Sequence, residues 1–212
     1  MIYFWPPTIF LKGCIATILI CMETRANPFF SPVDEILFEQ RYIQVSGGVG
    51  SQLAYIINRQ LLAFDKLSDS KPIFMFIDSP GGEINSGFSI YDTARFIKAP
   101  VFTIVAGLAA SMGSIIALCA PKERRFALPN SKLLIHQPLI SGYLQGPASD
   151  LAIHAEDIVK TREKINLLYS VETGRSVEEI TKLTDRDKWL TPQEAQSLGL
   201  ISKIIKSKAE LI

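Results

Sequence analysis

The segment Val101–Leu118, VFTIVAGLAASMGSIIAL, constrains the fold of this chain more than any other stretch. It opens with a β-branched, apolar run, Val101–Val105, which predicts a buried strand, and Met112–Leu118 predicts a tightly packed helix. Ser111 therefore stands where a strand gives way to a helix, a place where free backbone N–H groups favour negative charge. The same position suits a helix N-cap, so this segment alone leaves both interpretations open. The small residues before Ser111 predict a turn: Ala106, Gly107, Ala109 and Ala110.

The length of 212 residues fits one domain of ordinary size with an appendage. A net charge of +1 provides no basic field that would favour nucleic acid, and the chain has no acidic tail. Three cysteines are too few for a disulfide framework, and two histidines, His136 and His154, argue against a metal site. The hydrophobic content of 48% predicts either a membrane segment or apolar surface that is buried between subunits.

Residues 1–30 differ in character from the rest, and we expect them to be separate from a domain over residues 31–212. Their apolar run, Cys14–Met22, is shorter than the ~20 residues that a transmembrane helix needs. The region also lacks the basic start and the small-residue cleavage site of a signal peptide. An unusual N-terminal arm, or a true start at Met22, therefore explains it better than a weak export or anchor segment.

Strand and helix patterns alternate along the remaining chain, which predicts an α/β fold with a mainly parallel sheet and crossover helices. Tight turns are predicted at Ser46–Gly48 and Asp78–Gly82, where the first two strands end. N-cap residues predict helices that start after Ser176 and Thr191. Apolar spacing predicts helices over 52–67, 86–97 and 150–173, and strands over 41–45, 73–77, 125–128, 132–135 and 201–205.

Two polar residues at element ends fit nucleophilic catalysis. Ser111 is a candidate nucleophile at its strand-to-helix junction. His136 directly follows the apolar strand 132–135, where a general base would be held rigidly, although a histidine bonded to a backbone carbonyl fits the same position. His154 is a rival base, but its place inside a predicted helix favours a surface or interface role.

Such a pair also needs an acid to orient the imidazole and donors to bind an oxyanion. Asp187 is a candidate acid in a loop, and nothing in the sequence excludes Asp185 or Asp78. The two glycines that end DSPGG let backbone N–H groups face a ligand, and with the N–H of Met112 they could form an oxyanion hole, although a plain β-turn is the simpler interpretation.

Longer stretches of the chain resemble the proteolytic subunit of the Clp protease, a family of serine peptidases. These stretches are FIDSPGGEINSGFSIYDTARFIKAPV, GLAASMGSIIAL, RRFALPNSKLLIHQPL and TDRDKWLTPQEAQSLGLI. They stand in the family's order, and the resemblance spans residues 34–206, most of the chain. It implies a serine endopeptidase, the proteolytic part of an ATP-dependent protease that degrades unfolded proteins to short peptides.

The resemblance also implies roles for individual residues. It makes Ser111 the nucleophile, His136 the general base and Asp187 the orienting acid, and it makes the N–H groups of Gly82 and Met112 the oxyanion donors. An extended peptide substrate would pair as an added strand with two segments. Their residues are Gly82, Glu83 and Ile84 in the first segment and Leu139, Ile140 and Ser141 in the second.

The implied fold is a crotonase-like spiral of ββα units with helix 150–173 protruding as a handle. Two seven-membered rings would stack through these handles into a tetradecamer, which would account for the apolar composition. Asp185 and Arg186 match the pair that links ring to ring. A hexameric Clp ATPase would dock on aromatic pockets at Phe74, Phe76 and Phe96, although ordinary core packing fits these residues equally well.

By the same resemblance the ATPase partner uses ATP, and this chain needs no cofactor and no metal. We expect a cytoplasmic protein with no membrane or nucleic-acid partner. Three departures stand out: residues 1–30 do not resemble the family's axial segment, the stretch 139–149 is longer than usual, and Asp78 stands where asparagine is frequent.

These departures keep alternatives open: a weakly active scaffold in a mixed ring with a second subunit of the same type, or a membrane-associated serine peptidase of related fold. A crotonase-type acyl-CoA hydratase would share the fold, but it has no use for Ser111 with His136.

Overall fold

A computed structural model of the chain describes residues 31–140 and 145–211. Residues 1–30 and Ser141, for which the sequence made predictions, lie outside this range. The described residues belong to two compact units, of which the first ends at Gln40 and the second begins at Arg41. In the first unit, helix α2 (Pro32–Glu39) starts with a capping box, because Ser31 and the residue three positions on, Asp34, each accept the other's backbone N–H.

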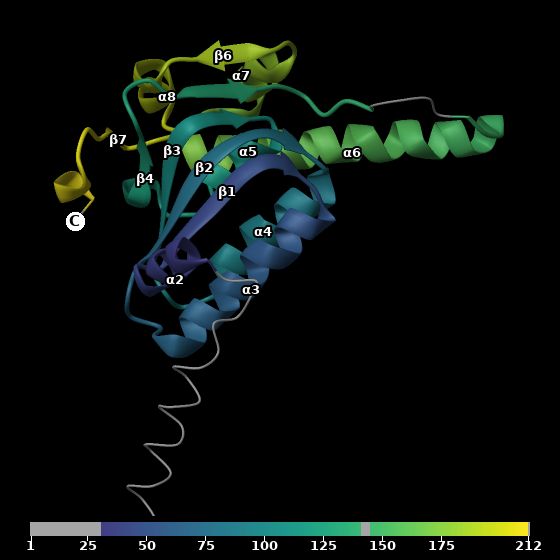
Figure 1. Cartoon of the computed structure of the whole chain (residues 1–212). Helices are drawn as coiled ribbons and strands as arrows, with labels where there is room; N and C mark the ends of the chain where they lie inside the picture. Colours follow the sequence, from purple (N-terminus) through teal and green to yellow (C-terminus); the bar gives the residue numbers. More distant parts are fainter. Residues whose placement is uncertain (1–30, 141–144, 212) are drawn as a thin grey trace, which may run out of the picture. The chain divides into compact units, whose positions relative to one another are not determined.

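The second unit is built on a mostly parallel sheet with the strand order β1-β2-β3-β4-β7 (Figure 1). The long strand β3 has two different neighbours on one side. Its first half, Thr103–Val105, pairs with β4, and its last residues, Leu108–Ala110, pair with β5, which in turn pairs antiparallel with β6. The strands are β1 (Tyr42–Val49), β2 (Ile73–Gly82), β3 (Val101–Ala110), β4 (Arg125–Ala127), β5 (Lys132–Ile135), β6 (Lys188–Leu190) and β7 (Lys203–Ile204).

Three predicted turns are wrong, because the strands continue through them. β1 includes Ser46–Gly48, β2 includes Asp78–Gly82, and β3 includes the small residues up to Ala110. The continuations are irregular, since the β1–β2 register shifts between Ser46 and Gly48. Glycine and alanine let neighbouring backbones approach closely, so these stretches extend the sheet where larger side chains would end it.

Helices connect the strands as the apolar spacing predicts, and α3 and α4 pack against each other beside the sheet (Figure 1). Two helices end at glycines with left-handed backbone conformation, Gly174 and Gly199, and Thr191 forms a full capping box. The helices are α3 (Ser51–Leu67), α4 (Ile84–Phe96), α5 (Met112–Ala117), α6 (Ala148–Thr173), α7 (Val177–Thr184) and α8 (Pro192–Leu198), with short 3-10 turns η1 (Lys122–Arg124) and η2 (Lys208–Glu210).

Helix α6 extends well beyond the sheet (Figure 1). Every residue of its first part, up to Asp157, is exposed, whereas Ile165, Asn166, Tyr169 and Thr173 in its last part are buried. The predicted α/β class with a long protruding helix is therefore confirmed.

A buried arginine fixes the start of β1 against the end of α3. Arg41 has a positive φ of 56°, and its guanidinium donates to the carbonyl oxygens of Phe64, Ser68, Lys71 and Pro72 at 2.8–3.0 Å. These oxygens belong to the last turn of α3 and to the loop that leads into β2. One side chain thus holds the end of α3 and this loop together.

Near the end of α6, Glu172 joins α4 and β4 to the helix. One carboxylate oxygen pairs with Arg125, whose side chain is 1% exposed, and the other accepts the Tyr91 hydroxyl at 2.9 Å. Arg95 Nη2 lies 3.5 Å from the same second oxygen. Burial, with the hydrogen bond to Glu172, raises the pKa of the Tyr91 phenol.

Glu172→Ala should lower the free energy of unfolding by about 3–5 kcal/mol, because the buried guanidinium of Arg125 would lose its counter-ion. Urea denaturation followed by circular dichroism measures this change. Glu156→Ala is the matched control, since Glu156 pairs with Lys160 on the exposed part of α6, and it should shift stability by no more than about 0.5 kcal/mol. Equal, small losses in both variants would contradict the role of Glu172.

Candidate functional site

Ser111 lies at the junction between β3 and α5, as the sequence predicts, in an unusual backbone conformation. Its φ is 53° and its ψ is −123°, and its own N–H donates to the carbonyl oxygen of Leu134 on β5 at 2.9 Å. A positive φ in a residue with a Cβ is strained and is held only by its surroundings. Ser111 occupies the N-cap position of α5, but its side chain makes no capping hydrogen bond. The interpretation of this serine as a helix cap is therefore wrong, and its hydroxyl is free for another role.

The glycine end of β2 lies directly against this junction. A Cβ on Gly81, whose φ is 92°, would lie 2.6 Å from the carbonyl oxygen of Ala110 and 2.7 Å from the Ser111 Cβ. A Cβ on Gly82 would lie 2.2 Å from the carbonyl oxygen of Val49. A side chain at either position would therefore collide with a neighbouring strand or with Ser111. The two glycines let the DSPGG stretch of β2 lie closely between β1 and Ser111.

Strand pairing brings His136 and Asp187 together. Ile135 in β5 lies opposite Lys188 in the antiparallel strand β6. His136, which follows Ile135, and Asp187, which precedes Lys188, are therefore neighbours. The Nδ1 atom of His136 lies 3.0 Å from Oδ1 of Asp187. The side chain of His136 is 15% exposed and that of Asp187 is 63% exposed.

The rival acids and the rival base have other surroundings. Asp78 accepts the backbone N–H of Leu108 at 2.9 Å, which also explains how an aspartate fits this position. The carboxylate of Asp185 lies 3.9 Å from Arg186 Nε, while its backbone carbonyl accepts from Gln137. His154 lines a separate hollow of about 220 Å³ along α6. Geometry therefore selects Asp187 as the acid at the imidazole of His136.

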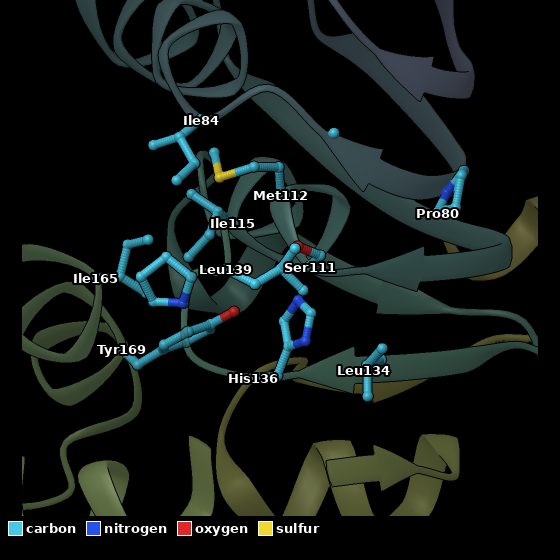
Figure 2. A pocket seen from close by; sticks show the side chains of 12 residues that line it. Pro80, Ile84, Ser111, Met112, Ile115, Leu134, His136, Leu139, Ile165 and Tyr169 are labelled. Atoms are coloured by element: carbon cyan, nitrogen blue, oxygen red, sulfur yellow. The ribbon is translucent and has the colours of Figure 1, made fainter. Parts of the chain in front are cut away.

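Ser111 and His136 line the same pocket, which has a volume of about 250 Å³. Figure 2 shows the His136 ring next to Ser111 among the residues that line this pocket. Among the described residues no hydrogen bond joins the two side chains, although such bonds are often long before substrate binds. Gly82 and Met112, the two predicted oxyanion donors, line the pocket as well. Met112 is the first residue of α5, where the N–H has no acceptor within the helix.

The apolar wall of the pocket includes residues that sequence reasoning missed. Ile165 and Tyr169 reach it from α6 and Ile115 reaches it from α5 (Figure 2). The available signal was the four-residue spacing of Ile165 and Tyr169, which places both on one face of a helix. Nothing in that spacing indicates which element the face meets.

The two predicted substrate segments border the pocket from opposite sides. Ile84 and Leu139 line it together with Gly82. The N–H of Glu83 donates to the carbonyl oxygen of Val49 at 2.8 Å, and the Glu83 carboxylate accepts a hydrogen bond from the Ser86 hydroxyl. Ile140 lies in the adjoining hollow with His154, and Leu139 and Ile140 are exposed.

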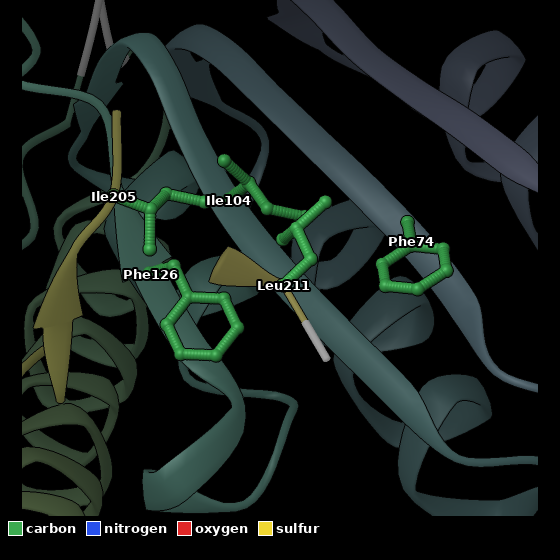
Figure 3. Packing of buried hydrophobic residues seen from close by; sticks show 5 residues of the cluster. All are labelled: Phe74, Ile104, Phe126, Ile205 and Leu211. Carbon is green, nitrogen blue, oxygen red and sulfur yellow. The ribbon is translucent and has the colours of Figure 1, made fainter. Parts of the chain in front are cut away.

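The predicted docking aromatics have three different environments. Phe74 is buried in a cluster with Ile104, Phe126, Ile205 and Leu211 (Figure 3). Phe76 lines an open apolar groove of about 210 Å³ beside that cluster, together with Tyr42 and Leu128. Phe96 is 82% exposed at the end of α4 and is not part of this groove.

Asp185 and Arg186, the predicted link between rings, are both exposed, at 63% and 88% of their side-chain surface. Among the described residues, no three histidine, cysteine, aspartate or glutamate side chains gather closely enough to hold a metal ion. Within the same residues no helix has the length and apolar character needed to cross a membrane.

Comparison with known proteins agrees with this geometry. A family model described as Clp protease matches residues 26–208. The chain is 51% identical to "ATP-dependent Clp protease proteolytic subunit 2" of Treponema denticola over 81% of this chain and 84% of that protein. It is 44% identical to the protein of the same name in Treponema pallidum, over 90% of this chain and 98% of that protein.

"ATP-dependent Clp protease proteolytic subunit 1" of Protochlamydia amoebophila is 45% identical, over 84% of this chain and 87% of that protein. The family model and these relatives cover most of the chain, and the residues that the family model matches include every residue that lines the pocket. The chain therefore belongs to the Clp protease family of serine-type endopeptidases.

Proposed function

We propose that this chain is the proteolytic subunit of an ATP-dependent Clp protease and cleaves peptide bonds with Ser111, His136 and Asp187. One observation carries the assignment of residues: the His136 Nδ1 atom lies 3.0 Å from Asp187 while the same ring lines the pocket of Ser111. A nucleophile, a base and an acid that orients the base are the parts that acyl transfer to serine requires.

In this mechanism His136 donates its Nδ1–H to Asp187, which leaves the lone pair of Nε2 available to the Ser111 hydroxyl. Nε2 takes the hydroxyl proton as Ser111 Oγ attacks the peptide carbonyl, and it then gives that proton to the leaving amine. Water, deprotonated by the same imidazole, attacks the acyl-enzyme and releases the second product.

The N–H groups of Gly82 and Met112 bind the oxyanion in both steps. Both residues line the pocket, and the strained turn at Ser111 places the peptide bond to Met112 directly after the nucleophile. Backbone donors fixed in this way need no reorganisation when charge develops, which is where most of their catalytic benefit arises.

The substrate is an extended, unfolded polypeptide that pairs by its main chain with Gly82, Glu83 and Ile84 on one side and Leu139, Ile140 and Ser141 on the other. Main-chain pairing is tolerant of sequence, and the pocket offers an apolar wall of Met112, Ile115 and Ile165 to one side chain. We therefore expect cleavage after apolar residues with little further selectivity.

The protein works as two stacked heptameric rings that are joined through α6. This helix exposes large apolar side chains, which a monomer would leave in water; they are Leu151, Ile153, Val159, Leu167 and Val171. Contacts of Asp185 and Arg186 with the opposite ring would order the loop that holds Asp187, whose side chain is 63% exposed in the single chain. A second subunit of the same type is a possible ring partner, since the relatives carry subunit numbers in their names.

A hexameric Clp ATPase docks on the apolar groove that Phe76 lines, and the ATPase rather than this chain uses ATP. Phe74 supports the groove from the core beneath it. Phe96 contributes from the end of α4 across a subunit boundary, since its side chain is exposed and lies outside the groove of its own chain. The protein acts in the cytoplasm and needs no cofactor or metal of its own.

Ser111→Ala should abolish hydrolysis of a short fluorogenic peptide and labelling by a fluorophosphonate, because no nucleophile would remain. The mass of the assembly in solution should not change. Labelling of the unaltered protein also excludes a purely scaffolding subunit, and persistent hydrolysis by the variant would refute the proposed nucleophile.

Asp187→Asn should lower kcat by a factor on the order of 10²–10⁴, because the amide would donate to Nδ1 and favour the tautomer with its proton on Nε2. Asp78→Asn is the matched control, since its side-chain oxygen can still accept the N–H of Leu108, and it should stay within about twofold of the parent. Steady-state peptide hydrolysis measures both variants. The assignment fails if the two losses are alike.

Phe76→Ala should abolish ATP-driven degradation of an unfolded protein while short-peptide hydrolysis remains within about threefold of the parent. The reason is that the groove would lose an aromatic anchor for the ATPase, whereas the pocket of Ser111 would keep all its residues. The two assays are run on one preparation with a Clp ATPase from the same organism. Parallel loss of both activities would instead indicate damage to the fold.

A further inference from the structure

A chain of buried hydroxyl groups leads from α6 to the backbone of the nucleophile. The Ser114 hydroxyl donates to the carbonyl oxygen of Ser111 at 2.7 Å. The oxygens of Ser114 and Tyr169 are also 2.7 Å apart. Ser114 and Tyr169 are each 1% exposed, so water does not compete for these bonds.

The donor and acceptor in each of these hydrogen bonds follow from the number of protons available. A carbonyl oxygen can only accept, so the single hydroxyl proton of Ser114 is committed to Ser111. Tyr169 must therefore donate its own proton to Ser114 Oγ. Burial raises the pKa of the Tyr169 phenol, which keeps it protonated at neutral pH and available as a donor.

The accepting oxygen belongs to the peptide unit that carries the proposed oxyanion donor. The carbonyl of Ser111 and the N–H of Met112 lie in one plane and point in opposite directions, because the peptide bond between them is planar and trans. Fixing the oxygen therefore fixes the direction of the N–H. The same oxygen also accepts the N–H of Ser114 at 3.0 Å and the N–H of Ile115 at 3.4 Å, both longer than the hydroxyl bond.

We propose that Tyr169, acting through Ser114, is a positioning residue that aims the N–H of Met112 at the oxyanion formed during peptide cleavage. This inference rests on the proposed function of Ser111. The first turn of α5 holds this peptide unit only through the bonds of 3.0 and 3.4 Å, and the hydroxyl bond of 2.7 Å is a third and shorter anchor on the same oxygen. Donors on the carbonyl also polarise the N–H at the other end of the unit, which strengthens its bond to an anion.

Tyr169 also lines the pocket that is proposed to bind substrate (Figure 2). Its hydroxyl bonds to Ser114, so the residue combines a hydrogen bond to α5 with a place in the pocket wall. Tyr169→Phe keeps the aromatic ring and removes only the hydroxyl, so it separates the positioning role from pocket shape.

Tyr169→Phe should lower kcat by about threefold to tenfold, the effect of one neutral hydrogen bond, and leave KM unchanged. The affinity for a peptide boronic acid, whose tetrahedral adduct on Ser111 places an oxygen in the oxyanion site, should fall by the same factor. Tyr91→Phe is the matched control, because it also removes the hydroxyl of a buried tyrosine, the one bonded to Glu172, outside the pocket. This control should leave kcat and boronate affinity unchanged.

A double variant separates positioning from structural support. Ser114→Ala leaves the buried Tyr169 hydroxyl without its partner, so it should lower both kcat and the melting temperature. Adding Tyr169→Phe removes that orphaned hydroxyl, and the melting temperature should recover while kcat stays low. Recovery of kcat together with stability would overturn the positioning role, because activity would then follow only the packing of the fold.

Failure of this inference can be told apart from failure of the proposed function. If Ser111→Ala is inactive but Tyr169→Phe matches the parent in kcat and boronate affinity, Ser111 remains the nucleophile and the positioning role is refuted. If Ser111→Ala keeps full hydrolysis, the proposed function itself fails. A loss in Tyr169→Phe that appears only in KM would also refute the inference, since it would indicate substrate contact.

Discussion

The close contact between the end of β2 and the turn at Ser111 is the constraint on which the rest of the site depends. A single methyl group on Gly81 would collide with the backbone of Ala110 and with Ser111 itself. This contact holds a serine at φ 53°, a conformation that an isolated chain would abandon. It also brings Gly82 of β2 to the pocket that Met112 lines. One close contact therefore positions the proposed nucleophile, the residues proposed as oxyanion donors and the strand proposed to pair with substrate.

A second constraint, the branching of the sheet, brings together the proposed base His136 and the proposed acid Asp187. Because β3 pairs with β4 through its first half and with β5 through its last residues, β5 ends beside Ser111. The hydrogen bond from Ser111 N–H to Leu134 locks that arrangement. The antiparallel partner β6 then carries Asp187 to His136, across 51 residues of sequence. His136 directly follows β5 and Asp187 directly precedes β6, so the pairing of these two strands sets the geometry at the imidazole.

Several parts of this arrangement could be predicted before the structure was known. The alternating strand and helix patterns gave the α/β class, and Ser111 could be placed at a strand-to-helix junction from local composition. The turns predicted at Ser46–Gly48 and Asp78–Gly82 were wrong, because small residues signal a turn when read alone and a close strand contact when a neighbouring backbone is present. Local patterns cannot distinguish a turn from a close contact between strands, because the difference depends on whether a strand from elsewhere in the chain packs against the small residues.

The sequence by itself determined the elements, their order and the family to which they are similar, because propensity, periodicity and motifs are local properties. Only the tertiary structure shows that the carboxylate beside His136 is that of Asp187 and not that of Asp185 or Asp78, since this depends on strand pairing across the sheet. It alone also divided the aromatics into the buried Phe74, the groove residue Phe76 and the exposed Phe96. The bond between Ser114 and Tyr169 has the same origin: 55 residues separate two hydroxyl groups that meet only when α6 packs against α5.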